Sequence, residues 1–342
     1  MSRSVPEVAR QLWLAGPEQL ELRDVAIEPP GPGEILLAIE SATTCGTDLK
    51  VFLRGGHPRM LEVPGPFGHE MTGRVAARGM GVERFSEGDT LVVANSASCG
   101  SCPPCVSARE NLCANLQYLN GAFADYLLLP ERFVTRSSYR RPPTLPIRIA
   151  SLAEPLACVE HGLERLNLAS RTSALVVGAG SLGLFFVAVL AEDGHAVTAA
   201  DRHPQRLAVA RGLGAGDAIR VGGERSFALP RAFDVTIDAT GTVDGWSSAV
   251  AATLPGGTVL IFGGCPPDSV LPLPTFPAHY DELALLGCYH HTPRSFARAV
   301  ARLAASPDRY ATLITDSCGL VGVEAALRAM QDRRALKVAV RP

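Results

Sequence analysis

Two short segments in the first quarter of the chain carry side chains that could bind a divalent metal ion. Cys45 begins the segment CGTD, and His69 and Glu70 lie in the segment GHEMTGRVAARG, residues 68–79. A thiolate and an imidazole suit a borderline-soft divalent ion such as zinc. A single Cys/His pair is more often a buried Cys and an unrelated His, so its interpretation depends on the rest of the sequence.

Four further cysteines are crowded into residues 99–113 with the spacing C-x2-C-x2-C-x7-C. Four thiolates can close a tetrahedral zinc site and leave no position for a substrate, which describes a structural zinc. Chance clustering at this spacing is implausible, and in a chain with no sign of secretion the pattern favours a metal over disulfides. We therefore predict a structural zinc lobe over residues 98–113. Its expected ligands are Cys99, Cys102, Cys105 and Cys113.

A glycine-rich turn in the second half of the chain could bind a dinucleotide. A short apolar run, residues 174–177, leads into GAGSLG, residues 178–183, and then into a helix-like apolar stretch. The first glycine would make a tight turn, the second would let a pyrophosphate approach the backbone, and the third would allow close helix–strand packing. The helix N-terminus favours the negative charge of the pyrophosphate. A plain strand-to-helix turn is the alternative. The candidate cofactor-binding residues here are Gly178, Gly180, Ser181, Leu182 and Gly183.

An acidic residue follows that turn at the distance typical of a dinucleotide fold. A strand expected over residues 196–200 ends at Asp201, 18 residues after Gly183. A carboxylate there accepts hydrogen bonds from ribose hydroxyls and repels a 2′-phosphate, which favours NAD over NADP. The adjacent Arg202 weakens this preference, because an Arg can accommodate that phosphate. Thr240, at the end of a later strand, is expected at the same ligand-binding edge of the sheet.

Size and composition describe a globular protein of two domains. The chain has 342 residues, of which 47% are apolar and 19% charged, and its net charge is −2. This charge gives no electrostatic reason to bind nucleic acid or an anionic membrane. We find no uninterrupted apolar run of membrane-spanning length and no signal-peptide pattern at the N-terminus, so we expect a cytoplasmic protein without a membrane partner.

The expected secondary structure changes character near Pro146. Residues 1–150 are predicted to be mostly β, with short apolar stretches between Pro- and Gly-rich turns. After Pro146, strands alternate with helices, which predicts an α/β fold with a parallel, doubly wound sheet. Its strands are expected at 174–177, 196–200, 217–221, 234–238, 258–263 and 283–288. The C-terminal part is expected to contain helices at 293–305 and 323–330 and a strand at 336–340.

The motif GHExxGxxxxxG at residues 68–79, together with the upstream CGTD segment, resembles the zinc-site signature of the medium-chain zinc-dependent alcohol dehydrogenases. The resemblance covers nearly the whole chain, and LAEPLA at 152–157 is similar to a stretch of the polyol dehydrogenases, a branch close to the threonine dehydrogenases. It implies a GroES-like, mostly-β catalytic domain over 1–154 and 289–342 and a Rossmann domain over 155–288. It also implies two zinc ions per chain, NAD as cofactor, and a homodimer or homotetramer.

The resemblance implies a catalytic zinc with three protein ligands and one open position. Cys45 and His69 supply two of them, and the third is Glu154 or Glu70. Glu70 could also alternate with water as a ligand or lie behind the ligands, and the sequence does not choose between these roles. Cys158 is interpreted as a core cysteine.

Other roles also follow from the resemblance. Asp48 is expected to accept the second N–H of His69, and Thr47 resembles the hydroxyl that takes the proton of the substrate. Arg206 is assigned to the adenosine ribose, with a solvated helix face as the alternative. The chain departs from the family in two places. Lys50 stands where many relatives have a His, and His290-His291 stand where polyol dehydrogenases often have Arg-Tyr.

The expected activity is hydride transfer between NAD(H) and a secondary alcohol or ketone, with a polyol, cyclitol or sugar-derived substrate. A 3-hydroxy amino acid dehydrogenase of the threonine type is the first alternative. A zinc-free quinone or enoyl reductase of the same fold is a less favoured alternative. Such enzymes lack the zinc ligands, so the presence of Cys45, His69 and Glu154 counts against it. A zinc-ribbon protein that binds nucleic acid would fit the four cysteines but not the net charge or the glycine-rich turn.

Overall fold

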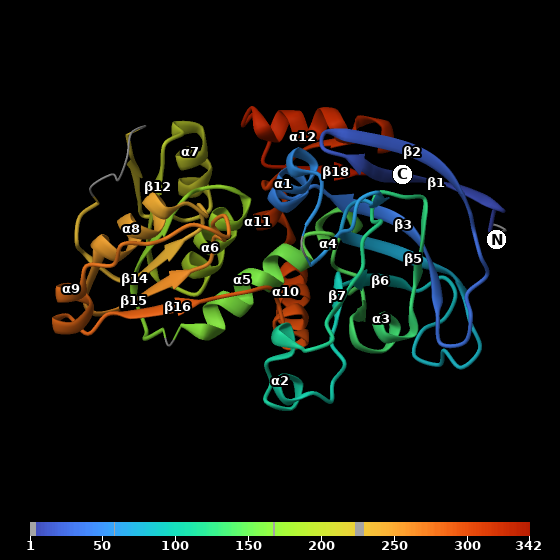
Figure 1. The fold of residues 1–342 in the computed structure, drawn as a ribbon, viewed down its shortest axis with the longest axis horizontal. Helices are drawn as coiled ribbons and strands as arrows, with labels where there is room; N and C mark the ends of the chain where they lie inside the picture. Colours follow the sequence, from blue (N-terminus) through green and yellow to red (C-terminus); the bar gives the residue numbers. More distant parts are fainter. Residues whose placement is uncertain (1–4, 58, 167, 223–228) are drawn as a thin grey trace. The chain divides into compact units, whose positions relative to one another are not determined.

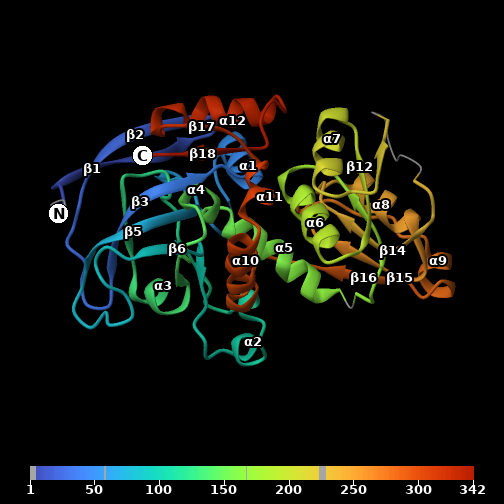
Figure 2. The same cartoon turned by 180° about the vertical axis from the view of Figure 1, so that it is seen from behind.

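A computed structural model describes residues 5–57, 59–166, 168–222 and 229–342, and Figures 1 and 2 show its ribbon from two sides. The chain forms two compact units. The first unit contains Met1–Ala157 and His291–Pro342, and the second unit contains Cys158–His290. These divisions lie close to the domain boundaries expected after residues 154 and 288. None of the helices in the described ranges is long and apolar enough to cross a bilayer.

The first unit is built on a seven-stranded sheet to which both of its sequence segments contribute strands. Its main path runs β10-β6-β5-β3-β18-β17, and β9 also pairs with β3. The C-terminal strand β18 (Lys337–Val340) pairs antiparallel with β3 (Ile35–Thr43), where Ala339 faces Thr43. The C-terminal segment therefore returns to the first unit, as the resemblance implies. The other strands of this sheet are β5 (Glu70–Arg78), β6 (Thr90–Val93), β9 (Tyr126–Leu129), β10 (Ser138–Arg140) and β17 (Ile314–Cys318).

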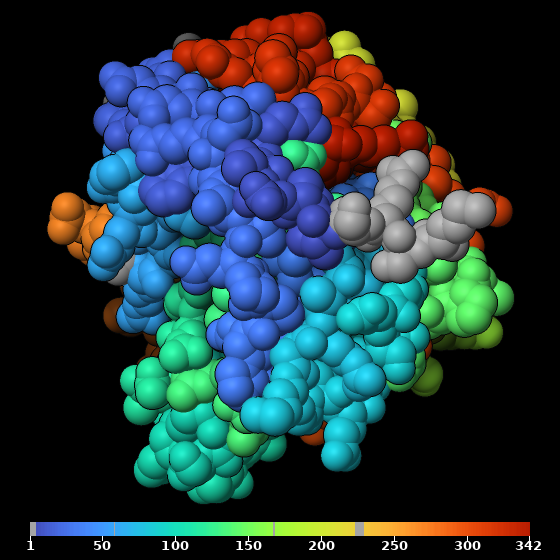
Figure 3. Space-filling view, turned by 90° about the vertical axis from the view of Figure 1, so that its right-hand side faces the viewer, coloured from blue at the N-terminus to red at the C-terminus, as the bar shows by residue number. Residues whose placement is uncertain are grey.

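Smaller elements surround this sheet. The three-stranded sheet β2-β1-β4 covers part of the core, where the Phe67 and Phe123 rings meet edge-on at 5.5 Å. Figure 3 shows the C-terminal segment (red) beside the N-terminal strands (blue), where Arg328 forms an ion pair with Glu18. The remaining strands are β1 (Val8–Gly16), β2 (Gln19–Ala26), β4 (Gly65–Pro66), β7 (Ser96–Ala97) and β8 (Gln117–Tyr118). The helices are α1 (Gly46–Arg54), α2 (Pro103–Val106), η1 (Glu110–Leu112), α3 (Glu131–Arg136), α4 (Ile147–Ala150), α5 (Ala153–Arg165), α10 (Pro293–Ala305), α11 (Pro307–Ala311), η2 (Leu320–Gly322) and α12 (Val323–Gln331).

The second unit contains a six-stranded parallel sheet with the order β13-β12-β11-β14-β15-β16. The strand order reverses between β11 and β14, which makes a topological switch point where α/β sheets bind ligands. This architecture confirms the predicted doubly wound sheet. Its strands are β11 (Ser173–Val177), β12 (Ala196–Asp201), β13 (Asp217–Arg220), β14 (Phe233–Asp238), β15 (Thr253–Ile261) and β16 (Ala284–Gly287). Its helices are α6 (Ser181–Glu192), α7 (Pro204–Gly212), α8 (Val243–Ala252) and α9 (Thr275–Tyr280).

Helix α6 connects the glycine-rich turn to the sheet and is apolar on all sides. Residues Leu184 to Leu190 are all completely buried. A helix that is apolar all round belongs in the interior of a domain, so α6 is packed on every face. This burial fixes the N-terminus of α6, and with it the glycine-rich turn, relative to the strands.

Candidate active site

Cys45 is held at the N-terminus of helix α1. It is the N-cap of this helix, and its Sγ accepts a hydrogen bond from the Thr47 backbone N–H at 3.4 Å. The Asp48 Oδ2 in turn accepts the backbone N–H of Cys45 at 2.8 Å. The Cys45 side chain also accepts the backbone N–H of Asp48, so Cys45 and Asp48 form a capping box, which fixes the cysteine relative to the helix. The positive end of the helix dipole also favours a negatively charged sulfur at this position.

Asp48 also fixes His69. Its other carboxylate oxygen, Oδ1, lies 2.9 Å from His69 Nδ1, and both side chains are buried. Asp48 therefore links Cys45 and His69 through its two oxygens, and it leaves His69 Nε2 for a further partner. Burial lowers the pKa of His69, but Asp48 and then Cys45 raise it, so the pKa lies well above its usual value. A cation bound between Cys45 and His69 would take the place of that proton.

Glu70 lies in the same cluster, at the start of β5. Ligand atoms of Cys45, His69 and Glu70 lie within 4.8 Å of one another. The Lys337 Nζ lies 2.8 Å from Glu70 Oε1 and 2.7 Å from Oε2, and Thr43 Oγ1 donates a hydrogen bond to Oε2. Lys337 was not anticipated from the sequence, because it is 267 residues from Glu70. A lysine in the otherwise apolar segment LKVAV is the one signal that could have revealed it.

Glu154 lies in the first turn of helix α5 and is buried beside the same charges. Its burial raises the pKa to about 7; His69 and Lys337 lower it, whereas Glu70 and Asp48 raise it. Its Oε1 lies 4.0 Å from the Nε2 of His291, which is itself 3.0 Å from Asn95 Oδ1. A buried carboxylate with a raised pKa is suited to binding a cation, because the cation offsets the cost of the buried negative charge.

The donor set of this region fits zinc. The thiol of Cys45, the imidazole of His69 and the carboxylate of Glu70 lie together, and the charge of the Glu154 carboxylate interacts with those of His69 and Glu70. Lys337 is the only buried Lys or Arg among the described residues. Nitrogen, sulfur and oxygen donors of this kind are the ligands of catalytic zinc sites.

Other residues singled out in the sequence lie around this cluster. Thr47 is half-buried in α1, and Lys50 on the same helix is exposed. His290 is the last residue of the second unit, whereas His291 is buried in the first. Cys158 is half-buried, so the expectation of a core cysteine is wrong; it lies where α5 leaves the first unit.

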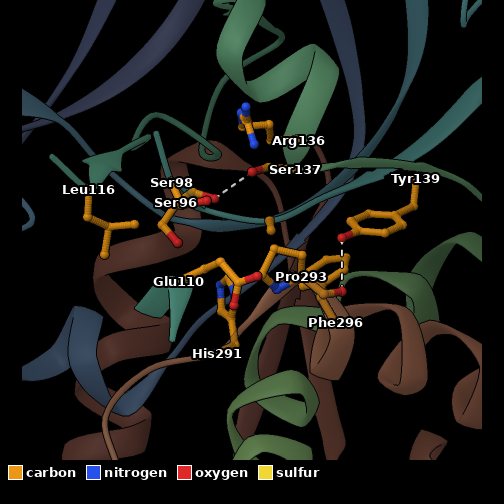
Figure 4. Close-up of a pocket in the computed structure, with 11 residues that line it drawn as sticks. Ser96, Ser98, Glu110, Leu116, Arg136, Ser137, Tyr139, His291, Pro293 and Phe296 are labelled. Atoms are coloured by element: carbon orange, nitrogen blue, oxygen red, sulfur yellow. Dashed lines mark hydrogen bonds between the residues drawn. The ribbon is translucent and has the colours of Figure 1, made fainter. Parts of the chain in front are cut away.

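A small pocket in the first unit lies beside His291 (Figure 4). Its walls are fixed by hydrogen bonds from Tyr139 Oη to the Pro293 carbonyl at 3.0 Å and from Ser137 Oγ to the Ser96 carbonyl at 2.6 Å. Cys45, His69 and Glu154 do not line this pocket. It therefore adjoins the cluster through His291 and is not the metal-binding position itself.

The four cysteines of the expected zinc lobe converge. Their sulfur atoms lie within 4.8 Å of one another, and three of the separations are 3.4, 3.8 and 3.9 Å. A tetrahedral site with Zn–S bonds of about 2.3 Å has S···S edges of about 3.8 Å, whereas a disulfide would need about 2.05 Å. All four are free cysteines, and their spacing fits a metal. The lobe is closed by the pairing of β7 with β8.

Backbone N–H groups point at these sulfur atoms. The N–H of Cys99 donates to Cys113 Sγ at 3.2 Å, and that of Cys102 donates to Cys99 Sγ at 3.4 Å. Hydrogen bonds from Ser101 and Cys102 lower the pKa of Cys99 to about 5, whereas burial raises that of Cys105 to about 12. Such N–H···S contacts stabilise thiolates, the form in which cysteine binds zinc.

The glycine-rich turn of the second unit has the geometry of a phosphate-binding turn. Gly178 has a φ of +96°, and a Cβ on Gly183 would lie 1.8 Å from the Gly178 carbonyl oxygen, so both positions require glycine. A Cβ on Gly180, the N-cap of α6, would meet nothing within 4 Å. The packing of the protein therefore leaves room for a side chain at position 180, whereas a pyrophosphate bound at the helix N-terminus would require glycine there.

Asp201 is tied to this turn. Its Oδ2 accepts the backbone N–H of Ala179 at 2.7 Å, and its Oδ1 accepts that of His203 at 2.8 Å. These contacts, which the sequence did not reveal, orient the carboxylate at the C-terminal end of β12. Thr240 packs against Gly178, and its Oγ1 donates to Asp238 Oδ1 at 2.6 Å. Arg206 is half-buried in α7.

A sheet with this strand order and turn, joined to a β-rich unit with two candidate zinc positions, is the organisation of a zinc-binding dehydrogenase. The alcohol dehydrogenase GroES-like domain matches residues 31–139, and the zinc-binding dehydrogenase domain matches residues 181–305. D-Altritol 5-dehydrogenase from Agrobacterium fabrum is 32% identical, with 86% of this chain and 88% of that protein aligned. L-Galactonate-5-dehydrogenase from Escherichia coli is 30% identical, with 84% of this chain and 85% of that protein aligned. The chain belongs to the zinc-dependent, medium-chain alcohol dehydrogenase family.

A solved structure supports this assignment. The zinc-binding dehydrogenase from Sinorhizobium meliloti 1021, bound to NADP, superposes with a TM-score of 0.87 at 26% identity and covers 98% of this chain and 100% of its own. The chain is therefore an oxidoreductase of the alcohol dehydrogenase type with a GroES-like and a Rossmann-type domain.

Proposed function

We propose that the protein transfers a hydride between NAD(H) and a secondary alcohol or ketone of a polyol, cyclitol or sugar-derived compound. The observation that carries this proposal is the link that Asp48 makes between Cys45 and His69, with Glu154 buried beside them. We assign Cys45, His69 and Glu154 as the ligands of a catalytic zinc. Zinc held by these residues would supply a Lewis acid, whose chemistry favours loss of a proton from a hydroxyl group.

The side chains around these ligands have separate roles in the proposed reaction. Asp48 holds His69 in the tautomer that presents Nε2, and it holds Cys45 through the helix cap. Thr47, half-buried two residues after Cys45, is the hydroxyl that relays the substrate's proton: it accepts that proton and passes its own outward to solvent. In the second unit, the glycine-rich turn binds the pyrophosphate of NAD. The nicotinamide of the NAD molecule is the hydride acceptor.

The names of the two relatives support a polyhydroxylated substrate. A panel of substrates tests this, and the oxidation of each is followed by the absorbance of NADH. The panel contains hexitols, sugar acids, cyclitols, amino-cyclitols, 3-hydroxy amino acids and simple secondary alcohols. Preferred oxidation of a hexitol, sugar acid or cyclitol is expected. Preferred oxidation of a 3-hydroxy amino acid would instead assign the chain to the threonine type. Metal analysis should give two zinc ions per chain, and a fully active protein with none would overturn the proposed site.

Asp201 tests the proposed preference for NAD. The solved relative holds NADP, so the preference of this chain depends on its own residues. We expect Asp201→Asn to shift the ratio of kcat/KM for NAD over NADP toward NADP by about 10- to 100-fold, the equivalent of about 1–3 kcal/mol. Asn retains an oxygen acceptor for the backbone of the turn but loses the charge that repels a 2′-phosphate. Steady-state kinetics with both cofactors measures this ratio.

Asp217→Asn is the matched control for this experiment. Asp217 begins the neighbouring strand β13, at the end of the sheet opposite to Asp201, and its side chain is exposed. The control should leave the ratio unchanged. An unchanged ratio in Asp201→Asn as well would contradict the assignment of Asp201 to the ribose.

We also propose that the protein is a homodimer or homotetramer. Val270, Phe276 and Tyr280 of the second unit are exposed, and the rings of Phe276 and Tyr280 lie 4.5 Å apart. Exposed apolar side chains in one segment are typical of an interaction surface. Analytical ultracentrifugation should give a mass of two or four chains of 36.1 kDa, and a monomer at micromolar concentration would refute the proposal.

A further inference from the structure

The buried ion pair between Lys337 and Glu70 has no role in the reaction described above. Lys337 is the first residue of β18, and its side chain is completely buried. Strand β18 pairs with β3 directly before Cys45, so the lysine is brought to the metal cluster by the C-terminal segment. A buried ammonium group is costly unless it is paired, so its position in the fold needs an explanation.

The Lys337 ammonium group donates two hydrogen bonds and forms an ion pair with both oxygens of Glu70. Nζ lies 2.8 Å from Glu70 Oε1, 2.7 Å from Glu70 Oε2 and 2.8 Å from the Thr44 carbonyl oxygen. Thr43 Oγ1 donates a further hydrogen bond to Glu70 Oε2. Both oxygens of Glu70 are therefore engaged from the side of β3 and β18.

Glu70 is nevertheless close enough to compete for a metal ion. It shares a 4.8 Å cluster with Cys45 and His69, and Glu154 lies close enough for their charges to interact. Cys45, His69, Glu154 and Glu70 together would make four protein ligands. A zinc site with four protein ligands is closed and has no position for substrate.

We infer that Lys337 is a positioning residue that holds Glu70 away from the catalytic metal, so that one coordination position stays open. This inference rests on the proposed zinc ligands Cys45, His69 and Glu154. Without the ammonium group, Glu70 would be a buried carboxylate whose nearest cation is the metal. Coulomb attraction at such short range would draw it into the fourth position.

The test uses the full-length protein with cobalt(II) in place of zinc and imidazole as the probe. The visible spectrum of Cys45→Ser, which keeps the four-cysteine lobe, is subtracted to isolate the catalytic site. In the wild type, imidazole should enter the open position and shift the spectrum. In Lys337→Met the shift should be lost, and chelator should remove the catalytic metal about 10-fold more slowly or less completely, because a ligand has been added.

Two further variants distinguish positioning from a merely structural role. Lys337→Met/Glu70→Gln removes both charges, so the response to imidazole should return, and Lys337→Arg should behave as the wild type. A structural salt bridge would instead give weaker metal binding in Lys337→Met and no recovery of the spectrum in the double variant. Lys337→Gln, which keeps a donor for the Thr44 carbonyl, replaces Lys337→Met if the latter does not fold.

The outcomes separate the inference from the proposed function. If the wild type binds no cobalt at Cys45, the proposed zinc site is wrong. If the wild type responds to imidazole and Lys337→Met responds equally, the site is correct and Lys337 does not control Glu70.

Discussion

Replacing Cys45 by Ser is expected to lower kcat by about 1,000-fold or more while NAD binding persists. The loss follows from the ligand role of Cys45, since a Lewis-acidic metal contributes several kcal/mol to transition-state stabilisation and each 1.36 kcal/mol is a factor of ten. The residues assigned to NAD belong to the second unit, which has its own sheet and core. NAD binding therefore does not require the thiol.

Serine is the informative replacement because of where Cys45 lies. Cys45 is the N-cap of α1, and Ser is among the best N-cap residues, so the start of the helix should be preserved. The measurements are kcat, zinc content, which should fall from two ions to one, and the NAD dissociation constant by calorimetry. Cys318→Ser is the control, because Cys318 is a half-buried cysteine of the same unit outside both clusters. Equal loss of turnover and of NAD binding would show that Cys45 supports the fold instead.

The residues that could be predicted from the sequence are those whose chemistry depends on local spacing. The four cysteines lie within 15 residues, and a short ribbon is enough to bring them together. The capping box joins Cys45 to Asp48 over three positions, and the glycine-rich turn adjoins α6 directly. In each case the backbone of one element determines the geometry, so a motif is sufficient evidence for it.

The contacts that could not be predicted join distant segments. Lys337 meets Glu70 across 267 positions, and His291 meets Asn95 across 196. These pairs depend on the pairing of β18 with β3 and on the return of the chain at residue 291. No local periodicity encodes such a register, because it results from the packing of the whole unit.

One strand of the second unit starts earlier than the sequence predicts, because glycines occur within it. Strand β15 begins at Thr253 and ends at Ile261, whereas the sequence predicted residues 258–263. The segment Pro255-Gly256-Gly257 lies inside β15, and the pairing with β14 resumes at Thr258 after a register shift. Gly256 has a φ of +76°, which lets the chain bend within the strand.

The second large effect is expected for the four-cysteine lobe, where Cys102→Ser should remove the structural zinc and lower the thermal midpoint by about 10 °C. The lobe has little packing of its own. It contains only the short helices α2 and η1, and Val106 and Leu112 are 72% and 48% exposed. Zinc binding by such clusters contributes about 10–16 kcal/mol in isolated peptides, and losing about 3 kcal/mol in a domain of this size lowers the midpoint by about 10 °C.

Differential scanning calorimetry and metal analysis test this expectation together, because the zinc content should fall to one ion per chain. Cys318→Ser is again the matched control. The remaining ion should be the one at Cys45, so the cobalt spectrum of that site should persist in Cys102→Ser. Since the residues between β7 and β8 would then form a long loop without apolar packing, protease should cleave within residues 98–116 before the rest of the chain. Unchanged zinc content and an unchanged midpoint would show that the four cysteines do not hold a zinc ion on which the fold depends.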